Sequence, residues 1–271
     1  MLKQRLLTAA VLIPLLVAAI FGLPTPYFSM LLAAVLAVAV WEWGRLVHFS
    51  AALWGIFAAG MLMTAGLAIT GRLVPAVMHI VVAAAMVWWL FAAVWILRYQ
   101  ATTTKITAWR GLLAGWLVLV PAFLSLAALH GEPVHGPGYV LFLLVLIWAA
   151  DSGAYFAGRR FGRRKLAPRV SPGKTWEGVA GGMAAAALVA AVGGRLLGLP
   201  GEALLWFVPL CLVVVMFSVV GDLLESLFKR EAGVKDSGRF LPGHGGALDR
   251  IDSITAAAPA FYLGLTLFEW P

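Results

Sequence analysis

Long apolar runs separated by short polar segments extend over the whole chain. Between the polar segments, nine apolar stretches can be delimited: Leu6–Gly22, Tyr27–Trp43, Ala51–Thr70, Pro75–Leu97, Gly111–His130, Tyr139–Gly158, Trp176–Leu197, Ala203–Val220 and Ile254–Trp270. None alternates apolar and polar residues as the strands of an outer-membrane barrel do, so the pattern predicts about nine transmembrane α-helices. The first stretch follows Lys3 and Arg5, as in a secretory signal, but no small-residue cleavage site follows it. We therefore interpret it as a retained membrane anchor.

The composition supports an all-α integral membrane protein. Of 271 residues, 62% are hydrophobic and 12% are charged, whereas water-soluble domains are roughly half apolar and a quarter charged. At about 20 residues per helix, the spans leave no room for a separate soluble domain. Residues 1–138 hold about five spans with acid-poor loops, and residues 139–271 hold the charged segments in which we expect the functional site. The single cysteine, Cys211, excludes a disulfide framework and a cysteine metal site.

The basic residues predict how the chain is oriented in the membrane. If the N-terminus is cytoplasmic, all but two of the 20 lysines and arginines fall in cytoplasmic segments, the exceptions being Arg72 and Arg195. This pattern satisfies the positive-inside rule and places the C-terminus outside. The net charge of +8 is then concentrated on the cytoplasmic face. Such a face suits anionic lipid headgroups or phosphates, and we expect no nucleic-acid partner.

Four polar side chains in the segment GDLLESLFKR are spaced to share one face of a helix. They are Asp222, Glu225, Ser226 and Lys229, at positions i, i+3, i+4 and i+7. An aligned polar face at a membrane boundary is a candidate site. The alternative is a solvated helix end with an ordinary ion pair.

The segment KDSGRFLPGHGGALDRID, residues 235–252, combines a glycine-rich turn with two acids. Asp249 and Asp252 lie three residues apart at the start of the last helix, so their carboxylates can point the same way. Such a pair favours a hard cation such as Mg²⁺. The preceding PGHGG lets the backbone approach a ligand closely and turn its N–H groups toward an anion. Alone, this turn is also typical of a flexible loop, but beside the acids and basic residues it indicates a phosphate and metal site.

Polar residues also lie at the cytoplasmic ends of the sixth and seventh stretches. Asp151 lies in the inner half of the sixth stretch, where a carboxylate is costly unless it pairs or binds a cation, so we expect it to face the protein interior. In SPGKTWEG, Ser171 and Lys174 lie at the mouth of a helix, where they can meet phosphate oxygens. The segment resembles the end of a P-loop, but Pro168 stands where a P-loop needs glycine.

Small residues recur at every fourth position of the seventh stretch. They are Gly178, Gly182, Ala186, Ala190 and Gly194. Such a stripe is typical of close helix packing rather than of chemistry.

Residues 226–252 resemble the signature of the phosphatidate cytidylyltransferase (CDP-diacylglycerol synthase) family. The matching positions are Ser226, Lys229, Arg230, Lys235, Asp236, Gly238, Leu241, Pro242, His244, Gly245, Gly246, Asp249, Arg250 and Asp252. Ala247 departs from the pattern, because the family more often has a larger aliphatic residue there. Residues 151–158, 171–178 and 221–226 also resemble family segments. The first half of the chain is similar only in hydropathy.

The resemblance implies a bacterial inner-membrane enzyme that converts CTP and phosphatidate to CDP-diacylglycerol and pyrophosphate, using Mg²⁺ on the cytoplasmic side. Family members are dimers with a dinuclear cation site, which implies a homodimer and a second cation. By motif position, the metal ligands would be Asp222 and Asp249, with Asp236 and Asp252 near them. Asp151 would orient a ligand without binding the ion.

The resemblance also implies which residues act on the substrates. The catalytic residues would be Asp222, Lys229, Asp249 and Asp252. The substrate-binding residues outside the turn would be Ser171, Lys174, Ser226, Arg230, Lys235 and Arg250. The turn would contact pyrophosphate or ribose through Gly243, His244, Gly245 and Gly246.

Two other functions fit parts of the pattern. A CDP-alcohol phosphotransferase acts on similar lipids, but it needs a D-G-x-x-A-R pattern with spaced aspartates, which this sequence lacks. A cation transporter could use Asp151 and Asp222, but it would need acids at mid-membrane depth on several helices. The first five stretches offer only Glu42, which lies near an end.

Overall fold

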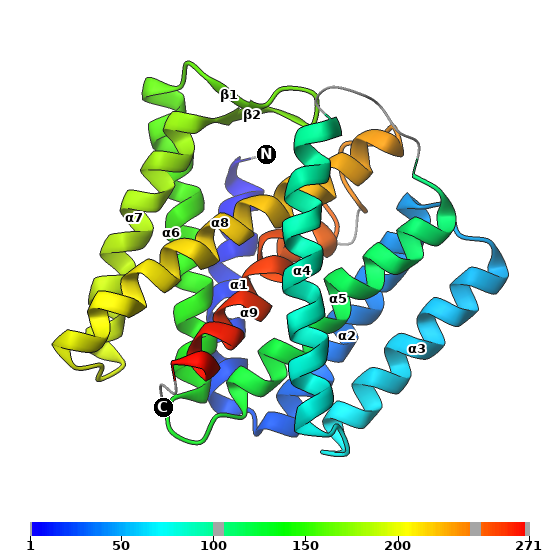
Figure 1. The fold of residues 1–271 in the computed structure, drawn as a ribbon, viewed down its shortest axis with the longest axis horizontal. Helices are drawn as coiled ribbons and strands as arrows, with labels where there is room; N and C mark the ends of the chain where they lie inside the picture. Colours follow the sequence, from blue (N-terminus) through cyan, green and yellow to red (C-terminus); the bar gives the residue numbers. More distant parts are fainter. Residues whose placement is uncertain (1, 100–105, 239–244, 269–271) are drawn as a thin grey trace.

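The computed structural model describes residues 2–99, 106–238 and 245–268. Within these residues, the helices are α1 (Leu2–Gly22), α2 (Thr25–Leu46), α3 (Ala51–Ile69), α4 (Pro75–Tyr99), α5 (Ala108–His130), α6 (Gly136–Phe161), α7 (Trp176–Leu196), α8 (Gly201–Glu231) and α9 (Leu248–Leu267). Between α6 and α7, strands β1 (Lys165–Ala167) and β2 (Ser171–Thr175) form an antiparallel hairpin. Figure 1 shows the helices as one bundle, with the hairpin at one end.

Seven of the described helices, α2 to α8, are long and apolar enough to cross a membrane. In lipid the backbone N–H and C=O groups must be satisfied within the segment, which is why long apolar runs fold as helices. The prediction of an all-α multi-pass membrane protein is therefore confirmed. The apolar part of α1, Ala10–Gly22, is shorter, and α9 begins with three charged residues, Asp249, Arg250 and Asp252. The count of nine spans and the orientation of the termini stay predictions.

Helix α8 extends well beyond the predicted span. The sequence pattern placed the end of the eighth span at Val220, but the helix continues without a break to Glu231, a total of 31 residues. At 1.5 Å per residue it is about 46 Å long, more than the roughly 30 Å of a hydrocarbon core. The extension is held by buried apolar residues opposite its polar face, including Leu224, Leu227 and Phe228.

The stripe of small residues on α7 makes a close helix contact, as predicted. Its five members are the buried residues of that helix. A Cβ atom on Gly182 would lie 2.8 Å from the carbonyl oxygen of Ala150, and one on Gly153 would lie 2.7 Å from that of Gly181. Helices α6 and α7 therefore approach to backbone distance, and they form a rigid pair that carries the hairpin.

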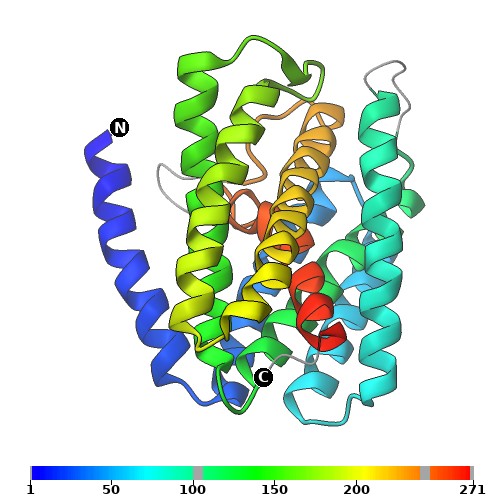
Figure 2. The ribbon, with the colours of Figure 1, turned by 60° about the vertical axis from the view of Figure 1, so that its left-hand side comes forward.

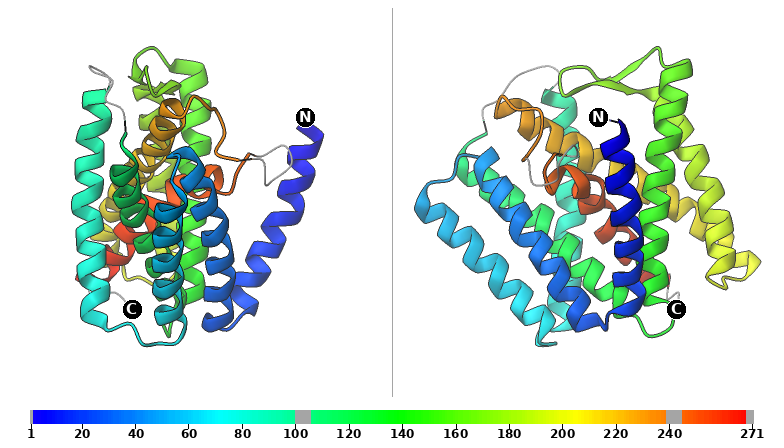
Figure 3. Two further views of the ribbon diagram at one scale, coloured as in Figure 1. Left: turned by 90° about the vertical axis from the view of Figure 1, so that its right-hand side faces the viewer. Right: turned by 180° about the vertical axis from the view of Figure 1, so that it is seen from behind.

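Helix α9 lies in the middle of the bundle. It packs against α8 and also against α4 and α5, and its residues Ala256, Ala257 and Ala258 are fully buried. Helix α1 lies at the periphery, as Figures 2 and 3 show from three sides. The start of α1 lies at the same end of the bundle as the hairpin, and α9 ends at the opposite end (Figure 1). This arrangement brings the start of α9 beside the end of α8.

Candidate active site

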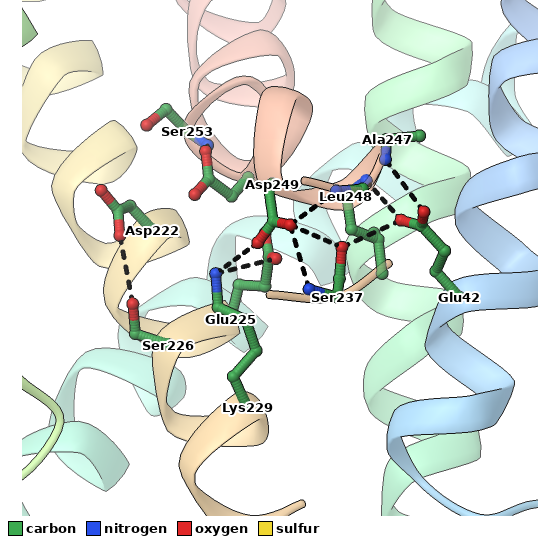
Figure 4. A network of polar contacts seen from close by, with 12 residues as sticks. Glu42, Asp222, Glu225, Ser226, Lys229, Ser237, Ala247, Leu248, Asp249 and Ser253 are labelled. Carbon is green, nitrogen blue, oxygen red and sulfur yellow. Dashed lines mark hydrogen bonds and ion pairs between the residues drawn. The ribbon is translucent and has the colours of Figure 1, made fainter. Parts of the chain in front are cut away.

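The polar face predicted on α8 is present. The Ser226 hydroxyl donates to Oδ1 of Asp222 at 3.3 Å. One turn further along, Nζ of Lys229 lies 3.2 Å from Oε1 of Glu225. Because the four side chains recur at helical spacing, they form a row along α8 that ends at the start of α9 (Figure 4).

Asp249, in the first turn of α9, joins this row through Lys229. Nζ of Lys229 lies 2.7 Å from Oδ1 of Asp249. The other oxygen, Oδ2, accepts hydrogen bonds from the backbone N–H groups of Ser237 at 3.0 Å and Gly246 at 2.8 Å. Gly245 has φ of +80°, a left-handed conformation that favours glycine. The glycine-rich turn thus directs an N–H group to an anion, and in this structure the anion is Asp249 itself.

The β1–β2 hairpin folds over the same end of α8. The sequence placed Ser171 and Lys174 at the mouth of a helix, and both lie on strand β2, which leads directly into α7. The strand places Nζ of Lys174 2.6 Å from Oδ2 of Asp222. Next to the hairpin strands, the carbonyl of Val170 accepts a hydrogen bond of 3.2 Å from Nε of Arg230. Ser171 is partly buried.

Asp252 and Glu225 line a small cavity between α8 and α9, with Trp43, Trp89 and Thr255 among its other walls. At about 10 Å³, the cavity has room for the centre of one water molecule. The ion pair of Glu225 with Lys229 lacks hydrogen-bond geometry, and neither Glu225 carboxylate oxygen has a hydrogen-bond partner among the described residues. Glu225 is thus a buried carboxylate whose partner among the described residues is the Lys229 ammonium group.

Asp151, on α6, faces this cluster, because its carboxylate interacts electrostatically with Asp222 and Lys174. Part of the residue stays accessible. The expectation that it faces the protein interior stays a prediction.

The remaining predicted residues are not brought together with these groups. Lys235, Asp236 and Arg250 are exposed, and no contact of their side chains with the acids is seen in the described part of the chain. Gly243 and His244 lie outside the described residues.

Two residues of the site were missed by the sequence analysis. Glu42, fully buried on α2, accepts N–H hydrogen bonds from Ala247 at 3.0 Å and Leu248 at 2.8 Å. The Ser237 hydroxyl lies 2.9 Å from Oε2 of Glu42 and 3.1 Å from Oδ2 of Asp249. The only sequence signal was an acid between two tryptophans of an apolar run, and this signal does not reveal its partners.

The arrangement offers acids for a hard cation and lysines for phosphates. Four carboxylates lie along the end of α8 and the start of α9, on Asp222, Glu225, Asp249 and Asp252, and a fifth, on Asp151 of α6, interacts with Asp222. The lysines paired with these acids are Lys174 and Lys229. Within the described residues, no three such side chains converge on a single metal position.

Comparison with known proteins identifies the family of this chain. The sequence model of the cytidylyltransferase family matches residues 3–268. The chain belongs to the cytidylyltransferase family. It is 42% identical to the phosphatidate cytidylyltransferase of Pseudomonas aeruginosa over 271 residues, which covers 100% of this chain and 99% of the relative. It is 40% identical to that of Haemophilus influenzae, covering 96% of this chain and 97% of the relative.

The predicted family resemblance is therefore confirmed over the whole chain, including the half for which the sequence showed only similar hydropathy. This cytidylyltransferase is a nucleotidyltransferase embedded in the membrane. The transporter and phosphotransferase alternatives are excluded by the family assignment.

Proposed function

We propose that this cytidylyltransferase transfers the cytidylyl group of CTP to phosphatidate, forming CDP-diacylglycerol and releasing pyrophosphate. In this reaction a phosphate oxygen of phosphatidate attacks the α-phosphorus of CTP. The bond from that phosphorus to the β-phosphate oxygen breaks, and pyrophosphate leaves with the electron pair. The observation that carries the proposal is the 42% identity to a phosphatidate cytidylyltransferase along the full length of both chains.

The nucleophile needs little activation. A phosphate monoester has a second pKa of about 6, so phosphatidate is largely a dianion at neutral pH. The main barrier is the approach of two polyanions and the charge that develops on the transferred and leaving groups. A site for this reaction must supply fixed positive charge and hydrogen-bond donors.

Lys174 and Lys229 are placed to supply that charge. Lys174 reaches the site from the hairpin and Lys229 from α8, and in this structure each holds a carboxylate at 2.6 to 2.7 Å. An ammonium group is a mobile point charge on a long stem, so it can turn from a carboxylate to a phosphate oxygen. The other proposed substrate contacts are Ser171, Ser226, Arg230, Lys235, Arg250 and the turn at residues 243–246.

The acids suit Mg²⁺. The atoms that they offer to a metal ion are carboxylate oxygens. Mg²⁺ commonly binds one or two carboxylates together with substrate phosphates. We assign the ion to Asp222 and Asp249, with Asp252 and the exposed Asp236 as further candidates, and the same acids would hold a second cation. When bound, Mg²⁺ neutralises charge on the phosphates of the substrate.

The site lies where both substrates can reach it. Phosphatidate keeps its acyl chains in the bilayer, and CTP arrives from the cytosol. The hairpin and the end of α8, both predicted to be cytoplasmic, lie at the same end of the bundle (Figure 1). We therefore place the site on the cytoplasmic side of a bacterial inner membrane, with the N-terminus inside and the C-terminus outside. Family resemblance supports a homodimer.

The test is a direct assay. The purified protein is incubated with radiolabelled CTP and phosphatidate in detergent micelles, with and without Mg²⁺. The expected result is labelled CDP-diacylglycerol that depends on both substrates and on Mg²⁺. Label incorporated equally without phosphatidate would contradict the proposal.

A further inference from the structure

Glu42 is a fully buried acid whose hydrogen-bond partners among the described residues come from the far end of the chain. Its carboxylate has 0% relative exposure, and a buried charge is costly unless it is hydrogen-bonded. The donors are the N–H groups of Ala247 and Leu248 and the hydroxyl of Ser237. Every one belongs to the connection between α8 and α9 or to the start of α9.

These contacts make Glu42 the N-terminal cap of α9. The first N–H groups of a helix lack partners within it and are usually capped by a nearby side chain. Ala247, at the capping position, makes no such bond. Glu42, which lies on α2, caps α9 instead. Its negative charge also suits the positive end of the helix dipole.

The same network continues to Asp249. The Ser237 hydroxyl lies within hydrogen-bond distance of both Glu42 and Asp249 (Figure 4). A hydroxyl has one hydrogen to donate, so the two carboxylates share it. With the N–H groups of Ser237 and Gly246, this contact surrounds Oδ2 of Asp249 with donors from the loop. Oδ1 is thereby left facing Lys229.

Two glycines show how tightly the loop is wrapped around Glu42. A Cβ atom on Gly238 or on Gly246 would overlap the Glu42 carboxylate. Glycine at these positions allows the backbone to approach the buried acid, since any side chain would force the two apart. The backbone at Gly238 and Gly246 is therefore matched to Glu42.

We propose that Glu42 is a positioning residue for the reaction. It contacts neither substrate, but holds Ser237 and the start of α9 so that Oδ2 of Asp249 is saturated with hydrogen bonds and Oδ1 is presented to Lys229 and to the cation. The inference rests on the proposed function. Outer-shell partners of a metal ligand typically change metal affinity or activity by tenfold to a hundredfold when mutated.

The experiment compares the wild type with Glu42→Gln and Ser237→Ala. The amide of Glu42→Gln puts an NH₂ group where an oxygen accepts hydrogen bonds. Ser237→Ala removes only the bridging hydroxyl and leaves the cap of α9 intact. The matched control is Glu132→Gln, because Glu132 also accepts two backbone N–H bonds, from Val134 at 3.0 Å and His135 at 2.6 Å, but between α5 and α6.

Three quantities are measured for each variant: kcat, KM for CTP, and the affinity for Mn²⁺, obtained from the electron paramagnetic resonance signal of the free ion. We expect Glu42→Gln and Ser237→Ala each to lower kcat and Mn²⁺ affinity by about tenfold or more, with KM changed less than kcat. The double variant should be no worse than Glu42→Gln, because both act through one network. Glu132→Gln should match the wild type.

Wild-type Mn²⁺ affinity and kcat in both site variants would overturn the inference, and a loss of thermal stability alone would then define Glu42 as a structural cap. If Glu42→Gln does not fold, Ser237→Ala decides the question by itself. If the wild type forms no CDP-diacylglycerol, the proposed function fails, and the Mn²⁺ comparison still tests Glu42.

Discussion

Lys174 of the hairpin and Asp222 of α8 form an ion pair of 2.6 Å in which both side chains are 28% exposed. Partly exposed pairs contribute only about 0–1 kcal/mol to stability, so structural stabilisation alone gives little reason for this contact. A second pair, Lys229 with Asp249, lies on the same polar face of α8 at 2.7 Å. Each acid assigned to the cation thus has a lysine beside it that can turn to a phosphate.

Replacing Lys174 tests the role of the first pair. We expect Lys174→Met to lower kcat about a hundredfold, as is typical when one donor to the transition state is lost, with little change in unfolding temperature. Lys165→Met is the control, because Lys165 is an exposed residue of the same hairpin. Equal activity of the two variants in the CDP-diacylglycerol assay would remove Lys174 from substrate binding.

The assignment of the acids is tested by charge removal at constant size. Asp249→Asn and Asp222→Asn should each reduce activity by on the order of a hundredfold or more at saturating CTP. Asp151→Asn should be milder, roughly tenfold to a hundredfold, if that residue only orients a ligand. Activity is measured across a Mg²⁺ titration. An Asp249→Asn protein with full activity and an unchanged Mg²⁺ midpoint would undo the metal assignment.

Lys229 also has a structural role that Lys174 lacks. The side chains of its two partners, Glu225 and Asp249, are only 4% and 6% exposed. Breaking a buried pair from one side typically costs about 3–5 kcal/mol, because it leaves an uncompensated charge. Lys229→Met should therefore lower the unfolding temperature in detergent, and adding Glu225→Gln should restore part of the loss. An unchanged unfolding temperature in the single variant would contradict this.

The contact between α6 and α7 is tested at Gly182. A Cβ atom there would lie 2.8 Å from the carbonyl oxygen of Ala150, so Gly182→Leu should separate the helices and destabilise the protein by about 1–3 kcal/mol. Leu188→Ala on the same helix is the control, since Leu188 is 67% exposed. Thermal unfolding of the two purified variants provides the measurement, and equal unfolding temperatures would refute the packing argument.

The orientation is tested with reporter fusions. A reporter after residue 271 should indicate the outer side of the membrane, and one fused after Ala167 the cytoplasm, because all but two of the 20 basic residues then lie inside. A cytoplasmic C-terminus would mean that one span was miscounted.

Local features of this protein were predictable from its sequence. The helices follow from long apolar runs, because lipid leaves the backbone no other partner. The polar face of α8 follows from helical spacing, which aligns Asp222, Ser226 and Lys229 whatever surrounds them. The close packing of α7 against a neighbouring helix follows from the repeat of small residues. Each of these properties depends on neighbours a few positions away in the chain.

The contacts between distant segments were decided only by the tertiary structure. Nothing near Glu42 in the sequence indicates that it caps α9, because that contact depends on how α2 and α9 pack. Likewise, the pairing of Lys174 with Asp222 depends on where the α6–α7 pair holds the hairpin, and the interaction of Asp151 with both depends on how α6 packs. Side-chain spacing sets the face of a helix, whereas the angle and register between helices are set by packing over the whole bundle. The sequence therefore determined which residues could act, and the packing of distant helices determined which of them meet.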